Sequence, residues 1–568
     1  MKRQQFIKML CLFILFSWGT TVHANDEVQM LKMQIEQMSQ SMEMLKKKIE
    51  DIEKKSHEEK EEVQYLSSRI DKAELHTATD KVSLDIELRT RADSLHYDDM
   101  QAAPSSFMGG FFTPVTAGGF NGATLNQIQQ GMINMAMAGM VPPTDEFDEE
   151  NDIIYTNKFH LDMKAKINKQ LSFTARMAAY KAWGDSSEVK FNHGNLGDIT
   201  MDGNTSSLPH GDTVHLERAY FVYGQQVKDI PVSLSIGRRP STYGPPLEAA
   251  NYSLEAGSPL GTIINWQFDG ASLAFGLEEL TGIYGSSIKF CYGLGFEGDW
   301  GNSYSLDSRN SFVDDVHMVG VIATLFDDDS LSAVFNYAHA WDITDGFTGL
   351  TVMPFIASKS DANGDGTDEY YFEPNSGGYI TRMQPVTEIG DWDAVSLLIR
   401  KNLYEELEKD IDFFIATSWS HTDPSKISIN PFYEIMGQGL LSSNGELESH
   451  SGYSVYAGAM FPMPFDARLG LEYNWGSKYW FNFTGAEDSL VGSKLAARGS
   501  VYEGYYIQPI FGKKFFFKLG ARFYDYEYSG SGNPLGKPVK ISSLSSMDAF
   551  FPVIDKVWDG YVSITIRL

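Results

Sequence analysis

The last eight residues, 561–568, alternate strictly between polar and apolar side chains. The same alternation recurs along most of the chain, in segments separated by short turns and long polar loops. A soluble strand with this pattern packs its apolar face on a core. A strand of a transmembrane barrel turns the apolar face to lipid and the polar face to a wet lumen. The recurrence, more than any one strand, favours a transmembrane barrel.

The alternating segments between residues 78 and 568 predict an all-β transmembrane barrel of about sixteen antiparallel strands, an even number like that of single-chain bacterial barrels. The strands are expected near 82–88, 159–167, 171–177, 214–224, 231–238, 262–276, 287–296, 315–326, 331–341, 391–402, 409–421, 451–461, 466–475, 500–511, 515–527 and 558–568. The apolar face changes parity at Asp269-Gly270. This is either a bulge or a hairpin turn, so eighteen strands are the alternative.

The connections differ in length on the two sides of the predicted barrel. Short links near 327–330, 404–408, 462–465 and 512–514 alternate with long ones, as short periplasmic turns alternate with long external loops in outer-membrane barrels. A soluble β-sandwich, the alternative, gives no such two-sided distribution.

The first long loop, 98–152, is expected to be external and to contain a short helix at Leu125–Met140. This helix either folds into the barrel mouth or contacts a neighbouring subunit or lipopolysaccharide. The acidic segment 145–152 predicts exposure at the rim.

The N-terminal region predicts export and oligomerisation. Residues 1–24 have the basic start, short apolar run and small-residue cleavage site of a signal peptide. Residues 25–77 are expected to form an α-helical coiled coil, because a heptad frame over 28–73 is interrupted only at Ser56 and Glu59. A single solvated helix is the alternative. β-Branched residues at both seam positions are compatible with a trimer, and we expect a periplasmic stalk.

Composition excludes several classes of protein. A formal net charge of −29 argues against nucleic acid as a partner. Beyond the signal no apolar run approaches the roughly 20 residues of a membrane helix. Catalytic signatures such as Gly-x-Ser-x-Gly and His-Glu-x-x-His are missing, so no enzymatic activity is expected. Cys291 is the single thiol left after signal removal, and the alternation turns it inward.

With the apolar faces toward lipid, ten basic side chains are predicted to line the pore: Lys158, Lys164, Lys166, Arg176, Lys289, Arg400, Arg468, Lys518, Arg522 and Arg567. The same strands carry a smaller acidic set: Asp85, Glu87, Asp162, Asp412 and Glu472. A basic wall favours anions, because low-dielectric walls focus its field. The alternative is that inward charges pair across strands and leave little net field.

One loop has the spacing of a calcium site. Asp361, Asn363 and Asp365 place oxygens at positions 1, 3 and 5, and Asp368 and Glu369 follow them. The segment is not an EF-hand, since position 12 lacks the glutamate and no helix pattern flanks it. A plain turn is the alternative to a low-affinity calcium site, and no other cofactor is expected.

Several motifs resemble those of one bacterial family. They are Gly237-Arg238-Arg239-Pro240-Ser241-Thr242, Asn265-Trp266-Gln267-Phe268-Asp269-Gly270, Cys291-Tyr292-Gly293, Gly476-Ser477-Lys478-Tyr479-Trp480-Phe481-Asn482-Phe483 and Asp525-Tyr526-Glu527-Tyr528-Ser529-Gly530-Ser531-Gly532. The chain resembles, over nearly its whole mature length including the coiled coil, a family of exported, porin-like proteins classed as a domain of unknown function. The resemblance implies an outer-membrane barrel and names no substrate.

These features predict a porin-like channel of the Gram-negative outer membrane for passive diffusion of small hydrophilic solutes, with a preference for anions. We expect contact with outer-membrane lipids and lipopolysaccharide, and a homo-oligomer, a trimer, formed through the coiled coil. The alternative is a non-conducting structural barrel that serves as a scaffold for a secretion or electron-transfer partner.

Overall fold

The computed structural model describes residues 82–184, 214–240, 251–252, 262–265, 267–298, 313–328, 330–346, 350–376, 380–382, 385–485 and 489–568. The predicted signal peptide (1–24) and coiled coil (25–77) lie outside the described residues. Residues 84–568 form one compact unit.

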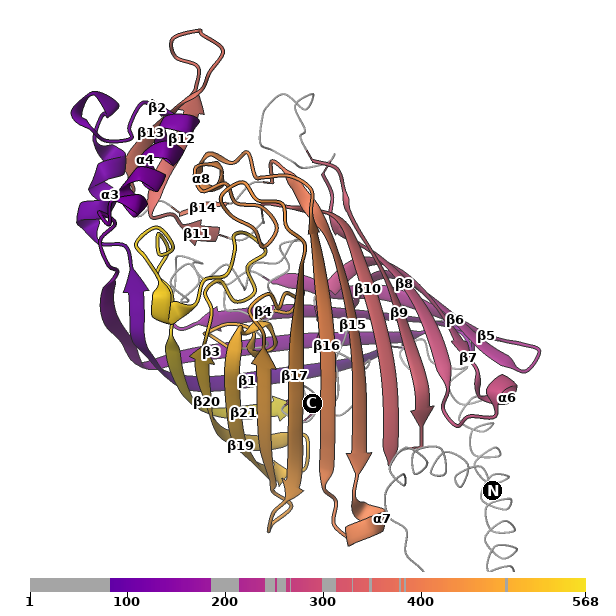
Figure 1. Ribbon diagram of the computed structural model, residues 1–568. Helices are drawn as coiled ribbons and strands as arrows, with labels where there is room; N and C mark the ends of the chain where they lie inside the picture. Colours follow the sequence, from indigo (N-terminus) through magenta and orange to yellow (C-terminus); the bar gives the residue numbers. More distant parts are fainter. Residues whose placement is uncertain are drawn as a thin grey trace, which may run out of the picture. The chain divides into compact units, whose positions relative to one another are not determined.

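Sixteen strands form a closed antiparallel barrel (Figure 1). They are β1 (Val82–Ala102), β3 (Asp145–Lys166), β4 (Leu171–Ala182), β5 (His215–Val227), β6 (Ile230–Pro240), β7 (Gln267–Gly276), β8 (Ser287–Phe296), β9 (Val316–Asp327), β10 (Leu331–Thr344), β15 (Glu388–Asn402), β16 (Asp412–Pro424), β17 (His450–Pro462), β18 (Arg468–Gly476), β19 (Gly499–Phe511), β20 (Phe515–Tyr526) and β21 (Lys556–Arg567). Barrel strands that follow one another in the chain pair with one another, and β1 closes the ring between β21 and β3. The predicted all-β barrel and its count of sixteen are confirmed.

The outer face of the barrel is apolar, unlike the surface of a soluble protein. On β21, Trp558 and Ile564 are about half exposed, whereas Asp559, Ser563 and Thr565 are buried. Side chains on a strand point alternately to opposite faces, so the last segment of the sequence presents its apolar side outward. An apolar exterior is stable where it meets lipid.

Strand β7 corrects two expectations from the sequence. It begins at Gln267 and not near 262, and its pairing with β8 runs without a break through Asp269↔Leu294 and Gly270↔Gly293. No hairpin forms at Asp269-Gly270, so the eighteen-strand alternative is wrong. The residues before β7 are apolar for another reason: Ile263 and Ile264 belong to a loop that packs inside the barrel, where Ile264 bridges to Phe483.

The long connections carry the remaining elements. The first contains α3 (Ser105–Phe112), η1 (Val115–Ala117), β2 (Ala123–Thr124) and α4 (Leu125–Met137), and the fifth contains β11 (Leu350–Val352), β12 (Phe355–Ser360), β13 (Glu369–Pro374) and β14 (Ile380–Arg382). The others hold α8 (Pro431–Glu434), η4 (Lys494–Ala496) and η5 (Ile541–Ser543). Two single-turn helices, α6 (Glu278–Thr281) and α7 (Tyr404–Leu407), lie in links at the opposite end of the barrel. No helix among the described residues is long and apolar enough to cross a bilayer.

The predicted helix at Leu125–Met140 is α4, which Thr124 begins with a capping box to Gln127. Strand β2 pairs with β13, so the first and fifth long loops form one structure at this end. The loop itself is shorter than the predicted 98–152, because β1 continues to Ala102 and β3 starts at Asp145. The acidic residues of 145–152 are mostly exposed on β3.

Candidate functional site

The inner wall of the barrel has an apolar half and a charged half. On β9, β10 and β15–β17 the buried inward residues include Val334, Trp392 and Phe414. The buried charged side chains of the wall, such as Arg91 and Glu503, lie mainly on β1, β3 and β18–β21, among uncharged residues that include many tyrosines. One side of the lumen is therefore lined by apolar side chains, and the other side carries the buried charges.

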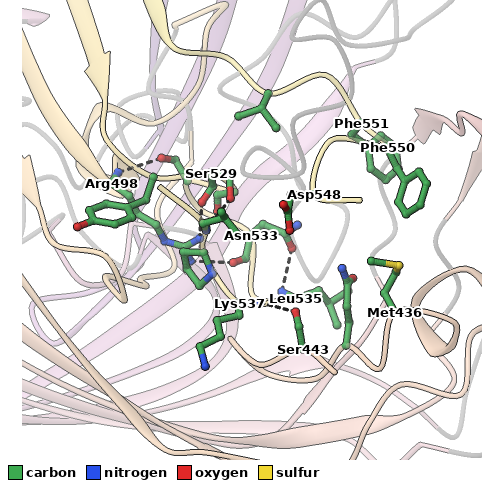
Figure 2. Close-up of a pocket in the computed structure, with 18 of the residues that line it drawn as sticks. Met436, Ser443, Arg498, Ser529, Asn533, Leu535, Lys537, Asp548, Phe550 and Phe551 are labelled. Atoms are coloured by element: carbon green, nitrogen blue, oxygen red, sulfur yellow. Dashed lines mark hydrogen bonds between the residues drawn. The ribbon is translucent and has the colours of Figure 1, made fainter. Parts of the chain in front are cut away.

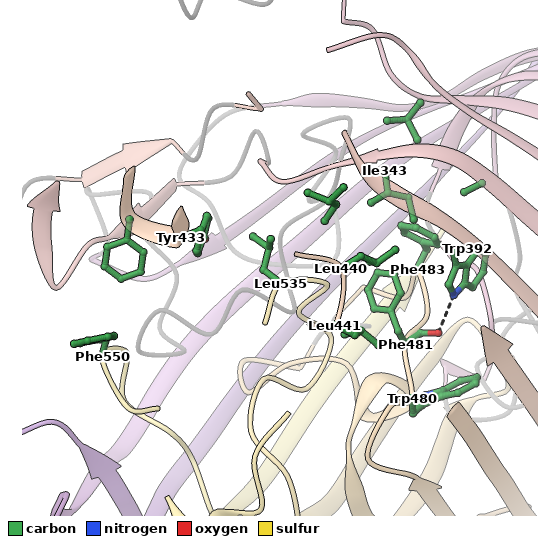
Figure 3. Close-up of a cluster of buried hydrophobic side chains, with 14 of the residues drawn as sticks. Ile343, Trp392, Tyr433, Leu440, Leu441, Trp480, Phe481, Phe483, Leu535 and Phe550 are labelled. Carbon is green, nitrogen blue, oxygen red and sulfur yellow. Dashed lines mark hydrogen bonds between the residues drawn. The ribbon is translucent and has the colours of Figure 1, made fainter. Parts of the chain in front are cut away.

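Several long loops pack against the apolar half, among them the segment with Trp480, Phe481 and Phe483 (Figure 3). Trp392 on β15 donates from Nε1 to the carbonyl oxygen of Phe481 at 3.2 Å, and its ring meets that of Phe483 edge-on at 4.7 Å. The backbone nitrogen of Phe483 donates to the carbonyl oxygen of Ile263 at 2.9 Å. Asn482 Nδ2 donates to the carbonyl oxygen of Thr262 at 2.8 Å. Segments 262–265 and 479–485 thus pair with each other against the wall and narrow the lumen.

The charged half is held together by pairing across neighbouring strands. The register sets Glu503 directly opposite Arg522 and Arg522 directly opposite Asp559. Arg522 Nε lies 2.9 Å from Glu503 Oε1. Arg91 Nη2 lies 3.1 Å from Asp559 Oδ2, and Arg91 Nε donates to Asp93 Oδ1 at 2.6 Å. At Glu503, Arg522 and Asp559, adjacent strands thereby supply opposite charges at one height, which compensates their removal from water.

Lys494 resolves a like-charge conflict in this wall. Glu472 and Glu503 stand opposite each other on β18 and β19. Lys494 enters from the long loop and donates to Glu503 Oε2 at 2.7 Å and also to Glu472 Oε2, with its side chain only 4% exposed. Two facing carboxylates destabilise a sheet, and the buried ammonium removes that cost. Lys494 therefore fixes the loop between β18 and β19 to the wall.

A basic pocket of about 30 Å³ lies nearer the end with the short links. One carboxylate, Glu87, and six basic side chains line it: Arg89, Arg91, Lys158, Lys518, Arg522 and Arg567. Arg567 Nε donates to Glu87 Oε2 at 2.6 Å, and its two Nη atoms donate to the carbonyl oxygens of Tyr252 and Asn251 at 2.6 and 2.9 Å. Residues 251–252 of the loop after β6 are thus held inside the barrel. The pocket has room for a water molecule or a small ion.

All ten sequence-predicted basic residues lie on the inward side of their strands, by the alternation of buried and exposed positions. Four of them meet in the basic pocket: Lys158, Lys518, Arg522 and Arg567. Arg176 lies beside them on β4, with Nε 2.7 Å from Asp162 Oδ1. Arg468 donates to the carbonyl oxygen of Asp410 in a short link at 2.9 Å. Lys164, Lys166, Lys289 and Arg400 are not part of this group.

The sequence reasoning missed several members of the charged wall. Arg89, Arg91 and Asp93 continue the inward parity of Glu87 on β1, so the alternation carried past residue 88 would have found them. Lys494 has no such signal, because it belongs to a loop. Charge pairing across strands, which the sequence left as an alternative, is extensive among the described residues.

The loop from Asp361 to Glu369 forms a turn whose oxygens are engaged with the backbone. Asp361 Oδ1 accepts from the nitrogen of Gly364 at 2.7 Å, Asp365 Oδ1 accepts from Thr367 at 2.8 Å, and Glu369 Oε2 accepts from Ala362 at 3.0 Å. Within the described ranges no group of three His, Cys, Asp or Glu side chains is placed to hold a metal ion. Asp368 is exposed in the same loop. The calcium site stays a prediction.

Cys291 lies between two outward-facing aromatic residues. Phe290 and Tyr292 are 48% and 46% exposed, so Cys291 on the same strand points inward. It lines a cavity of about 100 Å³ together with Ile263 and Phe268.

Asp345 links the two ends of the loop between β10 and β15 to the loop between β16 and β17, at the end opposite the short links. Its Oδ1 accepts from the backbone nitrogens of Val386 and Thr387 at 2.8 and 3.0 Å, and its Oδ2 accepts from Ser428 Oγ at 2.5 Å. Burial raises the pKa of the Asp345 carboxyl above its ordinary value, although these hydrogen bonds act in the opposite direction.

A closed sixteen-stranded barrel with an apolar exterior, a charged inner wall and inserted loops defines a porin-like transmembrane β-barrel protein. The chain belongs to the family described as "Protein of unknown function (DUF3373)", whose model matches residues 148–568. The match confirms the family resemblance, but it does not extend to the coiled coil as the sequence motifs suggested.

The chain is similar, at low identity and low TM-score, to several solved porin structures. OprB of Pseudomonas putida is 9% identical, with a TM-score of 0.38, over 85% of this chain and 94% of its own. The anion-selective porin of Comamonas acidovorans is 10% identical, with a TM-score of 0.38, over 86% and 99%. Salmonella typhi OmpF in complex with daunomycin is 11% identical, with a TM-score of 0.36, over 87% and 99%. None of the curated proteins matches this chain.

Proposed function

We propose that this protein is a porin-like channel of the outer membrane that passes small hydrophilic solutes by diffusion, with a preference for anions. The observation that carries the proposal is the charged half of the inner wall. Charges on seven of the barrel's strands face inward, where a packed structural core would carry apolar side chains. In outer-membrane barrels that conduct, a polar inner wall borders a water-filled lumen.

The preference for anions follows from the basic pocket. Six basic side chains and Glu87 line it, and Arg91 and Arg522 pair in addition with Asp93, Asp559 and Glu503. The six cations still outnumber these four carboxylates. A low-dielectric wall concentrates the field of the remaining positive charge in the lumen. Chloride and small carboxylates would therefore be enriched beside this wall.

The alternative is a non-conducting structural barrel. The observation that favours it is the packing of 262–265 and 479–485 against Trp392, which fills the apolar half of the lumen. A barrel closed in this way would act through its exposed loops, as a scaffold in the envelope.

The stalk and the oligomer belong to the same proposal. Residues 28–73 would associate three chains in the periplasm, and the apolar exterior would contact outer-membrane lipids and lipopolysaccharide.

Conductance in planar lipid bilayers separates the two functions. A channel gives steady single-channel steps that scale with salt concentration, whereas the structural barrel gives none. Glu472→Gln combined with Lys494→Met, which releases the loop from the wall while avoiding facing charges, is expected to increase the step size. If neither the wild type nor the double variant conducts, the proposal that the protein is a channel is contradicted.

A further inference from the structure

A cavity of about 460 Å³ opens at the long-loop end of the barrel, between the loops that follow β16 and β20 (Figure 2). Lys478 and Arg498, from the loop between β18 and β19, complete its lining. Ligand pockets usually have volumes of about 300–1,000 Å³. The cavity therefore has room for a small organic molecule.

The charged side chains in this lining are mostly cations: Lys478, Arg498, Lys537 and Lys540, against the single carboxylate Asp548. The carboxylate is occupied locally, because Asp548 Oδ2 accepts from the nitrogen and the hydroxyl of Ser545 at 3.0 and 2.6 Å. Lys537 is balanced by Glu446 at 3.1 Å. Lys478, Arg498 and Lys540 leave the cavity with an excess of positive charge.

Arg498 is a buried cation whose hydrogen bonds go to backbone. It is 1% exposed and donates to the carbonyl oxygens of Trp480, Ser529, Gly530 and Asn533 at 3.0, 3.0, 2.6 and 3.0 Å. It forms no salt bridge within the described part of the chain. Four of its five N–H groups are thereby used. Burial lowers the pKa of Arg498 to about 9, so the guanidinium is still charged at neutral pH.

The opposite side of the cavity is apolar. In Figure 2, Arg498 and Lys537 lie on one side, and Phe550, Phe551 and Met436 lie on the other. Phe551 is half-buried and packs against Phe432 with ring centroids 5.4 Å apart. Aromatic rings pair favourably in offset or edge-on arrangements at such distances. One side of the cavity thus suits an anionic group and the other suits an aromatic ring.

We propose that this cavity binds small aromatic carboxylates, with the carboxylate toward Lys478, Lys540 and Arg498 and the ring against Phe551 and Met436. The site goes beyond the proposed channel, because binding at the mouth is possible whether or not the lumen conducts. In a conducting barrel it would concentrate such solutes above the charged wall.

Benzoate is the probe for this proposal, with benzamide as its neutral counterpart of the same size. Titration of each into the purified, refolded protein in detergent micelles, followed by ligand-observed NMR, should show saturable benzoate binding with a Kd on the order of 1 mM. Lys478→Gln and Lys540→Gln should each weaken benzoate roughly two- to fivefold, as expected for partly exposed charge pairs, and leave benzamide unchanged. Phe551→Ala should weaken both ligands by roughly three- to tenfold.

Lys409→Gln, at the end with the short links, is the matched control and should change neither ligand. All three test substitutions replace partly or fully exposed side chains, so each variant is expected to fold. Heat-modifiable mobility on a gel would verify that each variant forms the barrel. The proposal is overturned if benzoate shows no saturable binding, if the lysine variants weaken benzamide as much as benzoate, or if inorganic phosphate binds as tightly as benzoate.

Discussion

Lys494→Met is expected to lower the free energy of unfolding by about 3 kcal/mol, because it removes the cation between two buried carboxylates. The side chains of Lys494, Glu472 and Glu503 are 4%, 2% and 1% exposed. Breaking a buried ion pair by removing one partner usually costs roughly 3–5 kcal/mol. Glu503 keeps Arg522 at 2.9 Å, and Glu472 keeps the hydroxyl of Tyr505 at 2.9 Å, so the lower end of that range applies.

Urea unfolding of the refolded protein in micelles, followed by tryptophan fluorescence, measures the change. Lys478→Met in the same loop is the control and should shift the unfolding free energy by no more than about 0.5 kcal/mol, since its side chain is partly exposed. Adding Glu472→Gln to Lys494→Met should recover about 1 kcal/mol or more, because the facing like charges are gone. If Lys494→Met unfolds at the same urea concentration as Lys478→Met, the wall is not held together as described.

Three further predictions concern other parts of the chain. A small charged thiol reagent should modify Cys291 in the folded barrel, and reaction only with a membrane-soluble maleimide would place the thiol on the lipid side. Because burial raises the folded-state pKa of Asp345, this carboxyl contributes stability that is fully present below its unfolded pKa and is lost as pH rises through the folded pKa. The wild type should therefore gain stability relative to Asp345→Asn as pH falls from about 7 to 4 in thermal unfolding followed by circular dichroism, and a constant difference would contradict this. Deletion of 28–73 should abolish oligomers in mild detergent and leave a heat-modifiable barrel, whereas retained oligomers would make the barrel wall the association surface.

The strands were predictable from sequence because their signal is local. An alternation with period two sets the face of every residue between lipid and lumen, and it placed a segment in each of the sixteen strands. The bounds of β1, β3 and β7 differ most from the expected ones. The prediction failed where the outward side chains of a strand no longer face lipid and therefore need not be apolar. The acidic start of β3, at 145–152, continues the sheet with polar residues on both faces and therefore looked like a loop.

The site was predictable only in part, for a related reason. The strand positions of Lys518 and Arg522 fix their inward direction, so their place in the lumen follows from the sequence. The positions of Lys494, Arg498 and the segment 262–265 depend on how long loops fold back into the barrel. That folding is set by contacts between residues far apart in sequence, such as Trp392 with Phe481, which no local pattern encodes.

The most direct test of the central claim is the zero-current potential of the reconstituted protein across a tenfold potassium chloride gradient. A channel lined by the basic pocket should pass a steady current. Its zero-current potential should have the sign expected when chloride is more permeant than potassium. Lys518→Gln should reduce that potential, whereas Lys514→Gln in an exposed turn should not. A potential of the sign set by potassium, or the absence of any steady current, would contradict the account.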